Sequence, residues 1–266
     1  MTDYDNKQTK PSGKKRLRLL TYNVQVGIPS KKFHHYLTNS WKHFLPFSKR
    51  KDNLDQISEF ISDFDIVGML ELDSGSIRSE FLNQPQYVSR KAGFNYCYSR
   101  VNRDLGILGQ HSLALFSRYE ASLVKEHELP SRIPGRGALE VHFSCGCDEP
   151  LVVVLAHLSL TPNARHKQLN YISKIISGHK YAVVMGDLNT TIESPEINNL
   201  IENTHLEAPT DSLHTFPSWK PRVAYDHILV TPYIKAGESE VYGLSHSDHL
   251  PIGQEVSYPR CIQVNT

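Results

Sequence analysis

YAVVMGDLN, residues Tyr181–Asn189, is a short apolar run that stops at an acid and an amide. The residues up to Met185 are too few and too β-branched for a helix, so they predict a buried central strand. Gly186 ends the run and lets backbone or a ligand approach closely. Asp187 and Asn189 follow at the carboxyl end, and strand residues two apart share a face. Such a pair indicates either a turn or a site for a metal-bound phosphate or a water.

Other stretches repeat this pattern of a polar or ionisable residue within or beside apolar sequence. They are LRLLTYNVQ (Leu17–Gln25), DIVGMLELD (Asp65–Asp73), PLVVVLAHLS (Pro150–Ser159), AYDHILV (Ala224–Val230) and HSDHLPI (His246–Ile252). The residues set in this way are Asn23, Glu71, His157, Asp226, Asp248 and His249. Ionisable groups in a core are costly unless they are paired or bind metal. The recurrence therefore indicates one shared cleft.

This ordered set resembles the motifs of the endonuclease/exonuclease/phosphatase superfamily, the deoxyribonuclease I-like fold. The matching positions are Asn23 after the first strand, Glu71, the pair His157-Leu158, Gly186–Asn189 as Gly-Asp-x-Asn, Asp226 in a late strand and Ser247–His249 as Ser-Asp-His. The match covers about Arg16 to Val256. The resemblance implies an α/β (α+β) fold, a four-layer sandwich of two mainly antiparallel β-sheets flanked by helices.

Composition predicts one domain after a tail. Residues 1–13 are polar, lack periodicity and are expected to be disordered; residues 14–266 form the domain. A length of 266 residues with 39% hydrophobic content suffices for a sizeable core. The net charge of +1 excludes a strongly basic nucleic-acid coat, although it allows a local patch.

Cysteine usage and the N-terminus bear on the compartment. The cysteines, Cys97, Cys145, Cys147 and Cys261, show no Cys-x-x-Cys spacing. Cys145 and Cys147 are compatible with a redox or metal pair, but a loop with two reduced thiols is favoured. The N-terminus lacks the apolar segment of a signal peptide, and no stretch reaches the ~20 apolar residues of a membrane span. We therefore expect a cytoplasmic protein.

Hydrophobic periodicity predicts helices at Asn53–Phe64 and Arg165–Ile176 and strands at Leu113–Ser117 and Ala138–Cys145. A shorter helix is expected at Ile77–Phe81. Asp73 is a candidate either to cap that helix or to border the substrate.

The stretch Gly27–Lys51 mixes aromatic residues with lysine, arginine and histidine. One interpretation is a surface helix, about Lys32–Phe44, that packs its aromatics on the fold. Aromatics among cations can also stack bases while holding phosphates, or enter a lipid headgroup layer. If the stretch is functional, it should govern specificity rather than chemistry.

The resemblance also implies a divalent metal. Glu71 is expected to be the first ligand, with Asn23 and Asp248 in or beside the same shell. Mg²⁺ prefers oxygen ligands in octahedral geometry, and Mn²⁺ is a candidate substitute. The sequence offers no His/Cys tetrahedral set, which argues against zinc.

The remaining motif residues divide the acid-base work. Asp187 and Asn189 are expected to orient the attacking water or the phosphate, and Asp187 is also a candidate base. His249 resembles the family histidine that contacts the scissile phosphate, with Asp226 fixing its tautomer and favouring its charged form. His157 is expected to contact a nonbridging oxygen or to protonate the leaving group. Which histidine is the acid stays open.

Three further residues are candidate substrate contacts. His111 is interpreted either as a phosphate contact or as a structural histidine. Arg136 offers a planar fork for phosphate or is an exposed loop arginine. Trp219, in the loop before Asp226, is a candidate to line the cleft.

The sequence therefore predicts a monomeric Mg²⁺-dependent phosphodiesterase or nuclease that acts on nucleic acid. The alternative is a phospholipid or inositol-phosphate hydrolase that uses the same site, with headgroup contact through 27–51. Abasic-site endonucleases carry Trp-Asn at the first motif and Asn where His157 stands, so Tyr22-Asn23 and His157 disfavour that branch. A binding module that retains the fold is disfavoured because no metal ligand or catalytic histidine is missing.

Overall fold

The computed structural model describes residues 11–25, 47–104, 109–132, 135–144, 149–208, 213–244 and 246–261. The expected helix at Lys32–Phe44, the pair Cys145 and Cys147 and the first ten residues of the expected tail lie outside these ranges. Within them, no helix combines the length and the apolar character needed to cross a membrane.

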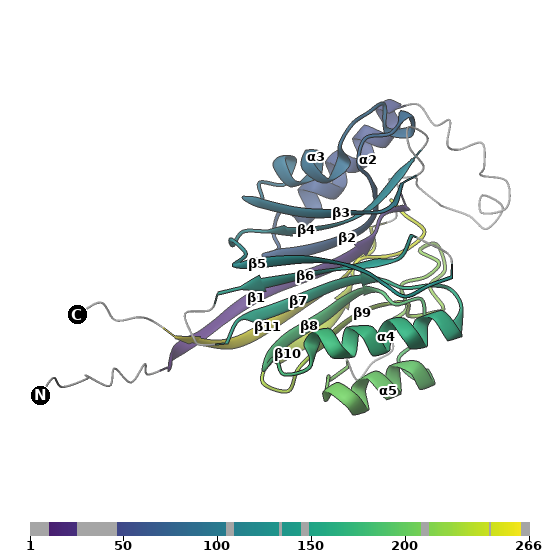
Figure 1. Ribbon diagram of the computed structural model, residues 1–266. Coiled ribbons are helices and arrows are strands. Elements are labelled where there is room, and N and C mark those ends of the chain that lie inside the picture. Colours follow the sequence, from purple (N-terminus) through teal and green to yellow (C-terminus); the bar gives the residue numbers. More distant parts are fainter. Residues whose placement is uncertain are drawn as a thin grey trace, which may run out of the picture.

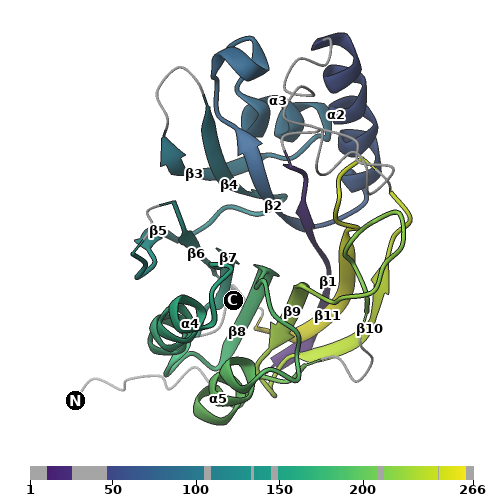
Figure 2. The ribbon, with the colours of Figure 1, turned by 90° about the vertical axis from the view of Figure 1, so that its right-hand side faces the viewer.

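Two β-sheets pack face to face between two layers of helices (Figure 1; Figure 2). Sheet A has the strand order β10-β11-β1-β2-β4-β3, and sheet B has the order β5-β6-β7-β8-β9. The strands of sheet A are β1 (Pro11–Asn23), β2 (Ile66–Asp73), β3 (Tyr96–Asp104), β4 (Gln110–Ser117), β10 (Lys235–Val241) and β11 (Ile252–Cys261). Those of sheet B are β5 (Leu123–Glu128), β6 (Gly137–Phe143), β7 (Leu151–His157), β8 (Tyr181–Asp187) and β9 (Asp226–Val230).

The helices cover the outer faces of the two sheets. The helices α2 (Phe47–Ile61) and α3 (Gln84–Lys91) lie over sheet A, and α4 (Pro162–Ile176) and α5 (Pro195–Thr204) lie over sheet B (Figure 2). All strand pairs are antiparallel except β1–β2 and β7–β8. The predicted four-layer, mainly antiparallel sandwich is therefore confirmed.

The central strands are apolar throughout because both of their faces are covered. In β7, Val153 and Leu155 point into the core between the sheets, whereas Val152 and Val154 point into the core beneath α4 and α5. The sheets are in close contact at Gly68 of β2, where an added Cβ would lie 2.4 Å from Leu155 Cδ1 of β7.

The two parallel strand pairs, β1–β2 and β7–β8, bring the carboxyl ends of four strands together. Each pair is joined through a helix, β1–α2–β2 in sheet A and β7–α4–β8 in sheet B. The register pairs Asn23 with Leu70 and His157 with Asp187. Because parallel strands end on the same side of a sheet, and Asn23 of sheet A bonds to Asp187 of sheet B, the polar residues at the carboxyl ends of these strands lie at one edge of the sandwich.

Some element boundaries differ from the predictions. Strand β1 begins at Pro11, so residues 11–13 belong to a strand rather than to a tail. Helix α2 begins at Phe47, within the last residues of the aromatic and basic stretch. Only one 3₁₀ turn, η3 (Ile77–Ser79), occupies the predicted helix after β2. Asp73 holds this turn, since its carboxylate accepts hydrogen bonds from the Gly75 and Ser76 amides at 2.9 and 2.8 Å.

Candidate active site

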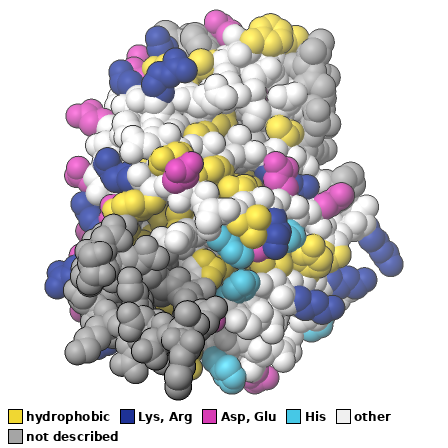
Figure 3. All heavy atoms as spheres, turned by 60° about the vertical axis from the view of Figure 1, so that its left-hand side comes forward, with side chains coloured by type: hydrophobic (Ala, Val, Ile, Leu, Met, Phe, Trp, Pro, Cys, Tyr) yellow, Lys and Arg dark blue, Asp and Glu magenta, His cyan; other side chains and the backbone are white. Residues whose placement is uncertain are grey.

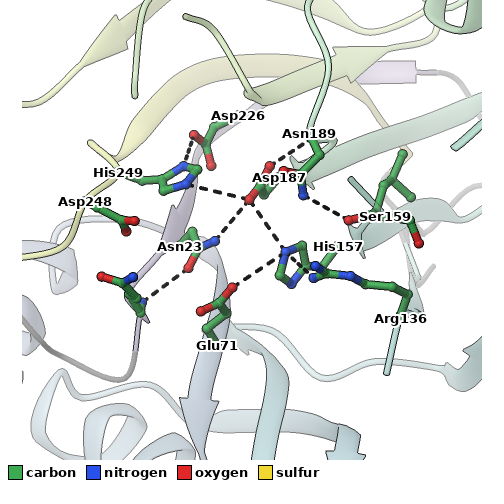
Figure 4. A network of polar contacts seen from close by, with 12 residues as sticks. Asn23, Glu71, Arg136, His157, Ser159, Asp187, Asn189, Asp226, Asp248 and His249 are labelled. Carbon is green, nitrogen blue, oxygen red and sulfur yellow. Dashed lines mark hydrogen bonds and ion pairs between the residues drawn. The ribbon is translucent and has the colours of Figure 1, made fainter. Parts of the chain in front are cut away.

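Asp187, the last residue of β8, lies at the centre of the polar network in Figure 4. Its Oδ2 accepts a hydrogen bond from Asn23 Nδ2 at 3.0 Å, which joins the two sheets. Gly186 before it has φ 137°, and a Cβ there would lie 2.0 Å from the Ala156 carbonyl oxygen. Only glycine permits this close approach of β8 to β7. Burial raises the pKa of the Asp187 carboxyl.

Asn189 does not share a strand face with Asp187, contrary to the prediction. Strand β8 ends at Asp187, and Asn189 has a left-handed backbone with φ 51°. Its backbone amide donates to Asp187 Oδ1 at 2.9 Å, and its side-chain Nδ2 donates to the Leu158 carbonyl at 2.9 Å. Asn189 thus joins the loops that follow β7 and β8.

Glu71 reaches the site through a β-bulge. The register of β2 against β4 shifts between Leu70 and Leu72, and Glu71 has φ 61°. A bulge redirects a side chain, and a positive φ at a residue other than glycine costs energy that functional sites often retain. The result brings Glu71 Oε1 to 3.7 Å from His157 Nε2.

The three predicted oxygen donors, Glu71, Asn23 and Asp248, lie together in the network of Figure 4. Burial and the nearby Asp248 carboxylate raise the pKa of Glu71, while Arg136 and His249 lower it. Two carboxylates held close together in a buried setting favour a bound cation. Carboxylate and amide oxygens are the ligands that hard divalent cations prefer, so these residues fit such a metal.

His249 is held by a carboxylate and faces Asp187. Its Nδ1 lies 2.7 Å from Asp226 Oδ2, and the Thr215 hydroxyl donates to the same oxygen at 2.6 Å. Its Nε2 lies 3.8 Å from Asp187 Oδ2. Burial lowers the pKa of His249, but Asp226 and Asp187 outweigh it and raise the pKa to about 10. The Phe216 ring packs on the imidazole, with 4.9 Å between ring centroids.

His157 lies on the other side of Asp187 and is neutral, whereas His249 is protonated. Its Nε2 lies 3.6 Å from Asp187 Oδ2 and 2.5 Å from Arg136 Nη1. A guanidinium has no acceptor, so Arg136 donates and His157 Nε2 carries no proton. Burial and the charge of Arg136 hold the pKa of His157 well below its ordinary value.

Asp187, Asp226 and His249 also have ligand atoms within 4.8 Å of one another. Hydrogen bonds from Thr215 and Asn23 and the His249–Asp226 contact already occupy Asp226 Oδ2 and Asp187 Oδ2. We therefore interpret this trio as a hydrogen-bonded chain and not as the metal site.

The structure brings nine of the predicted residues into one network, from Asn23 through Arg136 to His249 (Figure 4). His111 lies on β4, and its charge acts on His157. Trp219 lies in a turn whose neighbour Ser218 bonds to the Ser247 and Asp248 carbonyls. Substrate contacts by His111 and Trp219 stay predictions.

Thr215 and Phe216 are site residues that sequence reasoning did not assign. A bridge between Phe216 and Val223 folds this segment back over Asp226. The segment His214–Trp219 stands out in the sequence for its aromatics, but nothing in the order of residues shows that the Thr215 hydroxyl meets Asp226.

The comparisons agree with this geometry. The sequence model of the Endonuclease/Exonuclease/phosphatase family matches residues 20–249. A solved family protein from Bacteroides thetaiotaomicron is 17% identical with a TM-score of 0.71, covering 93% of this chain and 99% of that chain. A mannosyl-6-phosphatase of the same species is 17% identical with a TM-score of 0.67, covering 90% and 99%. Humanized TDP2 from D. rerio is 16% identical with a TM-score of 0.61, covering 91% and 98%. Curated protein sequences give no match.

At such identities the solved structures establish the fold, while the family match spans most of the chain and includes all the residues of the network. The family match supports phosphoester hydrolase activity for this chain. This chain belongs to the Endonuclease/Exonuclease/phosphatase family, whose enzymes depend on a divalent metal.

Proposed function

We propose that the protein is a Mg²⁺-dependent phosphodiesterase that cleaves nucleic acid. The observation that carries the proposal is Asp187 between two histidines of opposite state, the imidazolium His249 and the Arg136-bound His157. Hydrolysis of a phosphodiester needs an oriented water, a proton acceptor and positive charge at the nonbridging oxygens. This network holds a carboxylate that can orient a water and accept its proton, and it holds the positive groups Arg136 and His249.

Glu71, Asn23 and Asp248 would hold Mg²⁺, or Mn²⁺ in its place, through oxygen atoms. When bound, the ion supplies positive charge that polarises a phosphoryl oxygen. A magnesium ion keeps several waters and needs only one or two carboxylates from the protein. The carboxylates of Glu71 and Asp248 meet that requirement.

The other residues act on the water and the phosphate. Asp187 accepts the proton of the attacking water, since its carboxylate is buried and faces the site. His249 donates from Nε2 to a nonbridging oxygen, with Asp226 fixing its tautomer. Arg136 adds a second positive group, and His157 positions it by accepting its Nη1–H. Asn189 positions Asp187 through the amide contact.

An exposed aromatic in the segment after β2 supports a nucleic-acid substrate. Phe81 is 66% exposed on the segment that follows β2, the strand that presents Glu71. An exposed ring beside a phosphate-binding site can stack a base. Two exposed aliphatics, Ile77 at 50% and Leu160 at 71%, lie on segments after β2 and β7 and favour the alternative, a phospholipid headgroup substrate.

The test is hydrolysis of a panel with Mg²⁺ or with EDTA: single- and double-stranded DNA, RNA, sphingomyelin, an inositol polyphosphate and bis-p-nitrophenyl phosphate. We expect Mg²⁺-dependent cleavage of DNA or RNA, lowered at least ~10²-fold in His249→Ala. Cleavage of sphingomyelin alone would show that the substrate is a phospholipid and would leave the proposed hydrolytic mechanism unchanged. Cleavage of nucleic acid that persists in EDTA would contradict the metal.

Two variants that each replace an exposed aromatic residue by alanine test whether Phe81 contacts the substrate. Phe81→Ala should raise KM for nucleic acid several-fold and leave turnover of bis-p-nitrophenyl phosphate unchanged. Tyr233→Ala removes an aromatic that is 60% exposed beyond the far end of β9 and serves as the control. Equal effects of the two variants would contradict base stacking at Phe81. The cytoplasmic location and the monomeric state stay predictions.

A further inference from the structure

A second group of metal-ligating side chains lies on the outer face of sheet B. Glu140 and His142 are on β6, and His179 is in the turn between α4 and β8. Their ligand atoms all lie within 4.8 Å of one another. Alternate residues of β6, Leu139 and Val141, point into the core between the sheets. Glu140 and His142 therefore point away from that core, on the side that α4 covers.

This group is separate from the catalytic network. The register pairs Gly137 with His157 at the catalytic edge. Glu140 and His142 lie three and five residues further along β6, which places them about 10 and 17 Å from that edge. Figure 3 brings the left-hand side of Figure 1 forward and shows histidine side chains gathered beside basic and acidic ones.

We propose that Glu140, His142 and His179 bind a zinc ion. His142 Nε2 lies 2.5 Å from Glu140 Oε1, and the His142 and His179 rings meet edge to face with 5.2 Å between centroids. Two imidazoles and one carboxylate form a known zinc ligand set in which water takes the fourth position. Imidazole nitrogen disfavours Mg²⁺ and Ca²⁺, which prefer oxygen.

The distances suit zinc after small side-chain rotations. Bonds of about 2.0–2.1 Å to a tetrahedral ion place neighbouring donor atoms roughly 3.4 Å apart. The present separations run from 2.5 Å to at most 4.8 Å and bracket that value. The ion takes the lone pairs of His142 Nε2 and Glu140 Oε1, and the proton shared between them leaves to solvent.

Neighbouring residues orient the carboxylate. His127 Nε2 lies 2.6 Å from Glu140 Oε2, and His127 Nδ1 lies 3.1 Å from the Tyr171 hydroxyl on α4. With the proton on Nε2, His127 donates to Glu140 and accepts from Tyr171. Such outer contacts commonly hold metal ligands in place. Lys125 Nζ, 3.4 Å from Glu140 Oε1, opposes a cation, but its side chain is half-exposed and free to turn outward.

Bound zinc would connect β6 to the turn that leads into β8. His179 comes from a turn outside the sheet, whereas Glu140 and His142 come from a strand two positions away from β8 in sheet B. An ion that binds the folded chain and not the unfolded one stabilises the fold. Zinc should therefore raise the melting temperature without entering the reaction.

The full-length chain, stripped with EDTA, would be titrated with Zn²⁺ against a chromogenic chelator and with Co²⁺, whose four-coordinate complex absorbs visible light. The wild-type protein should bind one more Zn²⁺ ion than the His179→Ala or the Glu140→Gln variant. Only the wild-type protein should show the visible Co²⁺ absorption bands. Only the wild-type protein should show a rise in melting temperature when zinc is added. His179 is only partly buried and Gln matches Glu in size, so both variants should fold.

Matched controls separate this site from others. His166→Ala removes an exposed histidine of α4 outside the group and should change nothing. Lys125→Ala should tighten zinc binding, and His127→Ala should weaken it about tenfold. Equal zinc stoichiometry in wild type, His179→Ala and Glu140→Gln would overturn the proposal. So would loss of the tight ion in His249→Ala, because that would place zinc in the catalytic network.

Discussion

The Thr215 hydroxyl determines which oxygen of Asp226 serves His249. It donates to Oδ2, the same atom that meets His249 Nδ1. Among the described residues, the other oxygen, Asp226 Oδ1, is buried without a hydrogen-bond partner. The orientation of the carboxylate therefore depends on two contacts, one of which is the hydroxyl.

Thr215→Val should lower kcat about tenfold and leave KM nearly unchanged, because a hydrogen bond to a charged group is lost without loss of a substrate contact. Steady-state kinetics with bis-p-nitrophenyl phosphate measure this effect. Thr215→Ser keeps the hydroxyl and should restore most of the turnover. A kcat for Thr215→Val within twofold of wild type would show that Asp226 holds its place without Thr215.

Glu71→Gln keeps the size of the side chain and removes its charge. We expect loss of activity of ~10²-fold or more and a need for higher Mg²⁺ concentrations, because one of two carboxylates near the ion is gone. A Mg²⁺ titration of initial rates tests this. Near-normal turnover at saturating Mg²⁺ would remove Glu71 from the ligands.

Helices α4 and α5 are joined by a buried ion pair that also reaches a loop beside the site. Arg165 Nε and Nη2 donate to Glu196 Oε1 at 2.9 and 2.7 Å, and Arg165 Nη1 donates to the Leu160 carbonyl at 2.6 Å. Both side chains are buried. The pair therefore fixes the segment that follows His157 as well as the packing of the two helices.

Glu196→Gln should lower the free energy of unfolding by about 2 kcal/mol at pH 7, because it leaves a buried guanidinium without its counterion. Burial raises the pKa of Glu196, but its own backbone amide and Arg165 lower it by more, so the folded pKa is depressed. The pair therefore stabilises the fold above the unfolded pKa of about 4.3 and loses that contribution as the pH falls through the folded pKa.

Urea unfolding of wild type and Glu196→Gln at pH 7 and at pH 3 measures this dependence. The difference in unfolding free energy should be smaller at pH 3 than at pH 7. A difference independent of pH would mean that Glu196 contributes through packing and not through charge.

The elements differ in how well the sequence predicts them. The central strands β7 and β8 are apolar on both faces, so composition alone reveals them. The strands β5 and β10, LVKEHE and KAGESEV, were not predicted. They lie at sheet edges and are largely exposed, so no apolar periodicity marks them. These two strands form by backbone pairing with β6 and β11, and their side chains carry no pattern that reveals it.

The site residues also differ in how well the sequence predicts them. The motif residues lie beside apolar runs and could be predicted from the sequence. The bulge that redirects Glu71 depends on the register of β2 against β4, which sequence does not specify. The group of Glu140, His142 and His179 could not be predicted from the sequence, because His179 is far from the two β6 residues in the chain and meets them only in the folded protein.

The catalytic network spans both sheets, so its geometry depends on how they pack. Asn23 and Glu71 come from sheet A, while His157 and Asp187 come from sheet B. The tight contact between Gly68 and Leu155 lies only a few residues from Glu71 and His157 in the chain. A change in sheet separation should therefore alter stability and activity together.

Gly68→Ala should destabilise the fold by about 1–2 kcal/mol through overpacking, and Leu155→Ala by about 3 kcal/mol through a cavity. In the double variant the new methyl group occupies part of that cavity, so the loss should fall short of the sum by at least ~0.5 kcal/mol. Urea unfolding gives all three values. Strict additivity would mean that the two positions do not share the interface.

The pairing of β1 with β11 has a consequence for biosynthesis. Residues near the two ends of the described chain lie side by side, with Leu17 opposite Val256 and Thr21 opposite Ile252. Until β11 has been synthesised, β1 has β2 on one side and an open row of backbone hydrogen-bond groups on the other. An uncovered edge of this kind invites pairing with other chains. A chain truncated before β11 should therefore aggregate rather than yield a smaller enzyme.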